Sequence, residues 1–95
     1  MGTFYAQAVR WYRLAADQGD AFSQVILGVK YRNGEGTPQD FVEAHMWANL
    51  AASQLSGEDR DLAVRQRDDL AAQMTPDQIA EAQRRAREWT PTPKP

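Results

Sequence analysis

His45 is the residue with the most chemical potential in this 95-residue chain, because it is the only histidine and the chain has no cysteine. A metal ion needs several ligands that converge on one point, and among the nearby polar residues only Asn49 lies one helical turn away on the same face. Ser23 or Ser53 could act as a nucleophile beside His45, but neither stands in a Gly-x-Ser-x-Gly context. The sequence therefore predicts no catalytic residue, no metal site and no cofactor, and it places His45 at the surface or rim.

Charge and hydropathy exclude two further classes of partner. Eleven basic and thirteen acidic residues give a net charge of -2, which does not suit a phosphate backbone that attracts clustered positive charge. The longest uninterrupted apolar run, Val25 to Val29, is too short for a membrane span or a secretion signal. We expect a soluble single domain without nucleic-acid or membrane partners, in a compartment that the composition leaves open.

The sequence contains an internal repeat, which includes the segment around His45. The pattern A-x-x-W-x-x-L-A-A occurs twice, 36 residues apart, at Ala8, Trp11, Leu14, Ala15, Ala16 and at Ala44, Trp47, Leu50, Ala51, Ala52. Every matched position falls at helical spacing, which predicts a helical repeat of about 36 residues. The identical placement of Trp11 and Trp47 predicts that both anchor the core.

Capping and turn residues divide the chain into five predicted helices, at about 3–18, 21–32, 37–54, 56–74 and 75–89. Gly19 and Asn33-Gly34 provide stop signals, and the expected N-caps are Asp20, Thr37, Ser56 and Thr75. Gly28 costs about 1 kcal/mol relative to alanine inside a helix, so we expect it to permit close packing near Tyr31, Ala44 and Ala48. The alternate prolines of residues 90–95 cannot continue a helix and are expected to form a flexible tail.

A set of small, aromatic and turn residues carries a family resemblance: Ala21, Gln24, Leu27-Gly28, Tyr31, Gly34-x-Gly36, Pro38, Asp40, Phe41, Ala44, Trp47 and Ala51-Ala52. In this order they resemble the Sel-1-like repeat, a relative of the tetratricopeptide repeat with two helices joined by a glycine-containing turn. The resemblance implies an all-α, right-handed αα-superhelix. It would comprise a partial unit at 3–19, a full unit at 20–54 and a two-helix C-terminal cap at 56–89, all in one domain of residues 1–89.

The helix predicted at 21–32 is apolar on two faces, because Phe22, Ile26, Val29 and Asn33 fall within about 60° of one another, away from the residues assigned to packing. The resemblance implies that the first helix of each unit lines the concave side, where partner segments bind. We therefore predict a non-catalytic adaptor or scaffold that binds a protein or peptide through Phe22, Ile26, Val29, Lys30 and Asn33. Plain internal packing of this strip, against the closing helices or against a missing upstream unit, remains the alternative.

Two other functions stay open at this point. Phe4, Tyr5, Val9 and Tyr12 would normally pack on a preceding helix, so two copies could bury these ends together, or the chain could continue a longer array. Hydrolase activity, proposed for cysteine-rich relatives of the resembled family, has the least support because this chain lacks cysteine.

Overall fold

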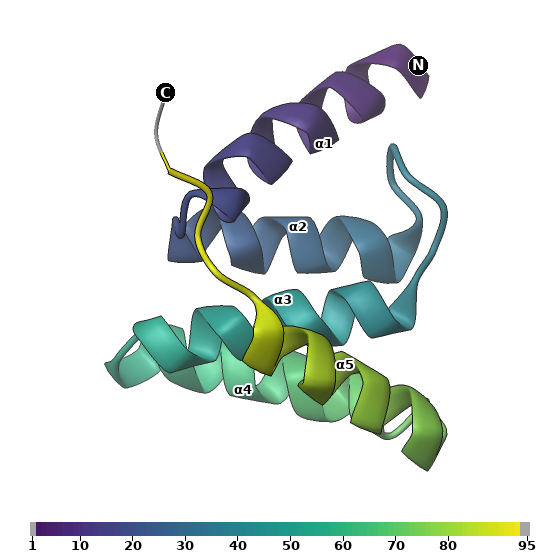
Figure 1. Ribbon diagram of the computed structural model, residues 1–95. Coiled ribbons are helices and arrows are strands. Elements are labelled where there is room, and N and C mark those ends of the chain that lie inside the picture. The colour runs from purple at the N-terminus through teal and green to yellow at the C-terminus, as the bar shows by residue number, and fades with distance from the viewer. Residues whose placement is uncertain (1, 94–95) are drawn as a thin grey trace.

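The computed structural model describes residues 2–93, and side chains from residue 4 onward within that range. The described chain forms α1 (Gly2–Asp17), α2 (Ala21–Asn33), α3 (Phe41–Gln54), α4 (Gly57–Ala71) and α5 (Pro76–Glu88). Between residues 2 and 93 there is no strand. Each of the first three helices packs on the next one, and α5 packs on α3 (Figure 1). The predicted all-α helical repeat fold is confirmed.

Polar side chains at the expected places start two of the helices. The Asp20 carboxylate accepts a hydrogen bond from the backbone N–H of Ser23 at 3.2 Å. Thr75 and Gln78 form a reciprocal capping box, in which each side chain binds the backbone N–H of the other residue. These bonds satisfy donors that a helix N-terminus would otherwise leave unpaired.

The N-terminal boundary of α3 differs from the prediction. Asp40, not Thr37, is the N-cap, because its carboxylate accepts the Glu43 N–H at 3.1 Å. The Asp40 N–H is meanwhile held by the Tyr31 carbonyl at 2.9 Å, which keeps residues 37–40 outside the helix. Ser56 also makes no side-chain cap bond, although α4 starts where expected.

The turn between α2 and α3 closes against the first helix. Gly34 ends α2 with a φ of 68°, and Gly36 has a φ of 78°, a region that residues with a side chain rarely adopt. A Cβ on Gly36 would also collide with the Tyr5 carbonyl. This turn therefore needs glycine at position 36 for two independent reasons.

The core is centred on α3. Residues 44–48 and 50–52 of this helix are buried, and they meet Leu27 from α2, Leu70 from α4 and Ala82 from α5, all fully buried. Because three neighbouring helices cover α3, its apolar surface extends around most of its circumference rather than along one stripe.

Gly28 lies at the closest approach of α2 to its neighbours. A Cβ at this position would lie 3.3 Å from the Ala44 carbonyl oxygen and 3.7 Å from the Ala48 nitrogen, which confirms the predicted contact with α3. It would also lie 3.0 Å from Nε2 of Gln66 on α4. The buried face of α2 consists of Ser23, Gln24, Leu27, Gly28 and Tyr31.

The two repeated tryptophans have different surroundings. Trp47 is 1% exposed and meets Trp89 in an edge-to-face contact, with ring centroids 6.2 Å apart and an interplanar angle of 76°. Trp11 is 72% exposed, so the prediction that it anchors the core is wrong. Trp89, the residue after α5, packs on the face of α3 that carries Trp47. The corresponding face of α1, which carries Trp11, is exposed in the described chain.

The described part of the proline-rich tail, residues 90–93, turns back from α5 toward the end of α1 (Figure 1). There the Thr92 N–H donates a hydrogen bond to the Asp17 carbonyl oxygen at 2.6 Å. A backbone hydrogen bond thus joins the tail that follows α5 to the end of α1. The rest of the expected flexible tail, residues 94–95, lies outside the described residues.

Candidate binding groove

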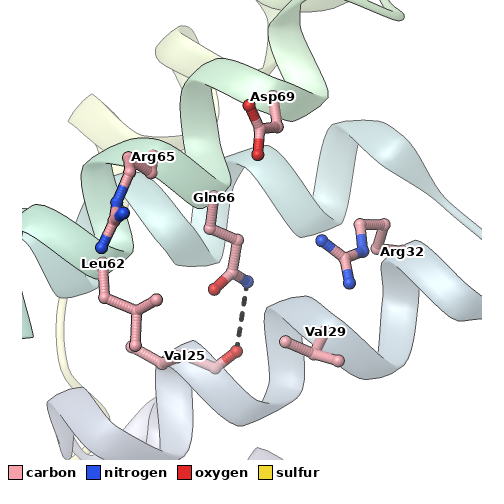
Figure 2. A pocket seen from close by; sticks show the side chains of 7 residues that line it. All are labelled: Val25, Val29, Arg32, Leu62, Arg65, Gln66 and Asp69. Carbon is pink, nitrogen blue, oxygen red and sulfur yellow. Dashed lines mark hydrogen bonds between the residues drawn. The ribbon is translucent and has the colours of Figure 1, made fainter.

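A hollow of about 410 Å³ lies between the outer faces of α2 and α4 (Figure 2). Both helices contribute residues at three- and four-residue intervals, so one face of each helix forms a wall. The lining residues are Val25, Val29, Arg32, Leu62, Arg65, Gln66 and Asp69.

Gln66 joins the two walls at the bottom of this groove. Its side-chain Nε2 donates a hydrogen bond to the Val25 carbonyl oxygen at 3.3 Å (Figure 2), and the residue is 7% exposed. The same amide occupies the space that Gly28 leaves free. The missing side chain on α2 therefore allows a polar residue of α4 to set the separation between the two helices.

The groove has an apolar centre. Val25 and Val29 are half-buried on α2, and Leu62 on α4 is 52% exposed. Phe22, one turn before Val25 and Ile26, is 57% exposed. Large apolar side chains thus remain open to a ligand on both walls.

Charged groups flank this centre. Figure 2 shows Arg65 beside Leu62, and Arg32 and Asp69 toward the other end. Arg32 Nε donates to the neighbouring Asn33 side chain at 3.3 Å. Among the described residues, neither Arg32 nor Arg65 forms an ion pair with a carboxylate. Both guanidinium groups are thus available to an acidic ligand.

Of the five predicted partner-binding residues, only Val29 lines the groove directly. Phe22 and Asn33 are exposed, and Ile26 is half-buried. Lys30 instead turns toward α1, where its Nζ lies 5.4 Å from the centroid of the Tyr5 ring. It also lies 3.9 Å from Glu35 Oε1.

Sequence reasoning missed six lining residues: Val25, Arg32, Leu62, Arg65, Gln66 and Asp69. The four on α4 follow a spacing of i, i+3, i+4 and i+7, which was visible in the sequence. This part of the chain is strongly polar, however, and a solvated face has the same spacing.

The residues predicted for self-association do not share one open face. Val9 is 7% exposed and Tyr12 packs against the core, because α2 covers that side of α1. Phe4 and Tyr5 remain exposed. The open side of α1 instead borders a second hollow of about 420 Å³, lined by Gln7, Arg10, Trp11 and Leu14.

His45 is buried, at 3% exposure, so the prediction of a surface or rim position is wrong. Its Nδ1 is buried without a hydrogen-bond partner in the described structure. Burial lowers the pKa of His45, the positive charge of Arg67 lowers it further, and Asp68 acts in the opposite direction. α4 covers this residue, which the polar appearance of that helix did not suggest.

The two candidate nucleophiles are engaged elsewhere. The Ser23 hydroxyl donates to the Asp20 carboxylate, and the Ser53 hydroxyl donates to the Leu50 carbonyl at 2.6 Å. Residues 2–93 contain no group of three His, Cys, Asp or Glu side chains placed to hold a metal ion. None of the five helices combines the length and apolar character needed to cross a membrane.

Comparison with protein families matches the Sel1 repeat at residues 5–20 and 21–54. The two matches together cover slightly more than half of the chain and include most of α1 and all of α2 and α3. No curated protein and no solved structure matches the chain. Sel1 repeats are non-catalytic helical repeats that generally mediate interactions between proteins. The repeated tryptophan pattern, the glycine turn and the family match lead to one conclusion: the chain belongs to the Sel1 repeat family.

Proposed function

We propose that this domain is a non-catalytic adaptor that binds a segment of another protein in the groove between α2 and α4. The observation that carries the proposal is the open apolar strip on α2, opposite the exposed Leu62 of α4. The interaction role of Sel1 repeats supports the class of function. The location of the site rests on the groove itself.

The apolar centre supplies affinity. When a partner side chain packs among Val25, Val29 and Leu62, apolar surface of both the partner and the domain is removed from water. Full burial of a leucine- or phenylalanine-sized side chain contributes about 1.5–3 kcal/mol. Phe22 and Ile26 extend the same strip along α2. The partner segment therefore carries an aliphatic or aromatic anchor.

The charged rim supplies orientation. Arg65 has no ion-pair partner among the described residues, whereas Asp69 lies toward the end of the groove that holds Arg32 (Figure 2). A carboxylate on the partner is attracted at the Arg65 end, whereas at the other end the repulsion by Asp69 offsets the attraction of Arg32. We thus infer an apolar anchor with an acidic neighbour on its Arg65 side.

The test uses an array of synthetic peptides of about ten residues that vary the anchor and its acidic neighbour. We expect the wild-type domain to prefer peptides that combine the two. Leu62→Ser and Val29→Ser should each weaken binding by about tenfold or more, and Arg65→Gln should remove the preference for the acidic neighbour. A matched control is Leu14→Ser, because Leu14 on α1 is 55% exposed and Leu62 is 52% exposed.

The double substitution of Phe22→Ser and Ile26→Ser tests the remainder of the strip. We expect this variant to lose peptide binding and to keep the helical circular dichroism of the wild type. Unchanged binding by Leu62→Ser, or equal losses in Leu62→Ser and Leu14→Ser, would place the site elsewhere. A large loss of helical signal on changing Phe22 and Ile26 would assign these residues to internal packing.

We also propose that the domain lacks hydrolase activity. The buried His45 and the engaged hydroxyl groups of Ser23 and Ser53 support this proposal. Hydrolysis of a generic ester by the wild type that disappears in both His45→Gln and Ser23→Ala would contradict it.

A further inference from the structure

The outer face of α1 is an apolar stripe built at helical spacing. Phe4, Trp11 and Leu14 are 78%, 72% and 55% exposed, and intervals of seven and three residues place them on one side of the helix. Gln7 and Arg10 lie between them and border the hollow of about 420 Å³. An exposed apolar patch of this kind is typical of a site that binds another molecule.

The internal repeat shows how such a face is covered. Trp11 and Leu14 match Trp47 and Leu50, which are only 1% and 8% exposed. On α3 this face packs against α5 and against Trp89, which follows it. The matching stripe on α1 therefore has the shape and chemistry of a surface that receives a helix.

The opposite end of the molecule does not offer a suitable helix for head-to-tail stacking. The outer surface of α5 is charged, with Arg84 held by Glu81 at 2.5 Å and by Glu88 at 2.8 Å. Stacking copies end to end would bury these charges against the apolar stripe at a high desolvation cost. A second copy can instead present its own α1, which carries four of the six large hydrophobic side chains that are exposed in the described chain.

The chemistry of Arg10 and Trp11 suits the same pairing. The stripe and its hollow contain one cation, Arg10, and no carboxylate. In an antiparallel pair of α1 helices, residues near the middle face each other, so Arg10 of each copy meets the partner's Trp11. A guanidinium group over an indole ring is a favourable contact.

We propose that α1 is a homodimer interface, in which two copies pack their first helices antiparallel about a two-fold axis. Trp11 of each copy enters the hollow bordered by Gln7, Arg10 and Leu14 of the other. This contact is isologous and closes after two copies, so it does not propagate into filaments. A helix of sixteen residues is about 24 Å long, so the interface is small and the dimer dissociates on dilution.

Sedimentation velocity between about 5 and about 500 µM tests the association by mass action. The wild type is expected to shift from monomer to dimer across this range, and Trp11→Gln and Leu14→Ser are expected to stay monomeric. Both residues are more than half exposed, so the variants should keep the thermal stability of the wild type. Leu62→Ser, the matched control on α4, is expected to dimerise normally.

Cysteine cross-linking tests the orientation, because the chain has no native cysteine. Antiparallel packing predicts that Arg10→Cys forms a disulfide-linked dimer under mild oxidation and that Phe4→Cys does not, since the two Phe4 positions lie at opposite ends of the helix pair. Efficient cross-linking of both variants would overturn the antiparallel arrangement.

A wild type that stays monomeric at the highest concentration would overturn the dimer, and so would dimers that persist in both Trp11→Gln and Leu14→Ser. Loss of dimers in Leu62→Ser alone would move the contact to the groove between α2 and α4. Peptide binding in the monomeric Leu14→Ser variant separates this inference from the proposed adaptor function.

Discussion

Gln66 on α4 fills the space that Gly28 on α2 leaves empty, with its Nε2 3.0 Å from the point where a Cβ of residue 28 would lie. The same nitrogen donates to the Val25 carbonyl. A mid-helix glycine and a buried glutamine from the next helix thus form one structural unit at the bottom of the groove.

This relationship predicts that Gly28→Ala destabilises the domain although alanine is the better helix former. Alanine gains about 1 kcal/mol in helix propensity, but its Cβ displaces the Gln66 amide and presses on the Ala44 carbonyl 3.3 Å away. The lost hydrogen bond and the strain together cost about 1–3 kcal/mol. We expect a lower free energy of unfolding in urea.

A double-mutant cycle with Gln66→Ala isolates the contact between the two residues. Gly28→Ala should be less harmful in the Gln66→Ala background, since the displaced amide is then absent. Additive losses in the double variant would show that Gly28 and Gln66 act independently.

The repeated tryptophans provide a second prediction, in which equal positions have unequal effects. Trp47→Ala removes a side chain that is 1% exposed and packs on Trp89, and it should cost about 3–5 kcal/mol. Trp11→Ala should change the stability of the monomer by less than about 0.5 kcal/mol. Urea unfolding at a concentration below the dimerisation range compares the two variants, and similar losses would contradict the exposed position of Trp11.

Local signals in the sequence were sufficient for much of the fold. Asp20 and Thr75 started helices because their side chains bind nearby backbone N–H groups, a property that depends on a few adjacent residues. The exposure of Trp11 could not be predicted from such local signals. It depends on which helix lies outside the repeat, and the pattern shared with Trp47 does not carry that information.

The groove, too, could be predicted only in part. The open strip on α2 followed from helical periodicity, since Phe22 and Val29 share a face that the packing residues do not use. Leu62 and Arg65 could not be assigned to the groove, because their spacing on α4 is equally typical of a solvated face. The way α4 packs on α3 decides which face of α4 meets α2, and Gln66 bonds to α2 on that face across 41 residues.

His45 makes stability depend on pH. Its pKa is lowered from 6.5 in the folded chain, first by burial and then by Arg67, with Asp68 opposing. The unfolded chain therefore binds this proton more readily than the folded chain, so the stability that neutral His45 permits is complete above about pH 6.5 and decreases as the pH falls below it. We expect wild type to lose more free energy of unfolding than His45→Leu between about pH 7.5 and about pH 5.5.

The comparison with His45→Leu removes the effect of the carboxylates, which titrate in both proteins. A leucine of similar size keeps the site between α3 and α4 filled. Parallel pH dependences of the two proteins would mean that His45 takes up its proton as readily in the folded chain as in the unfolded one.

The last prediction concerns the tail, in which Thr92 forms a hydrogen bond with the end of α1. Its N–H donates to the Asp17 carbonyl at 2.6 Å. Asp17 is the last residue of α1, and the last four carbonyls of a helix have no partner within that helix. Thr92→Pro removes the donor and keeps an extended backbone, so it should cost about 0.5–1.5 kcal/mol. Thr90→Pro is the matched control, since no hydrogen bond of its N–H is seen within residues 2–93. Hydrogen exchange provides a direct readout: the Thr92 amide should exchange more slowly than the Thr90 amide, and equal rapid exchange of both would mean that the tail does not hold α1 in solution.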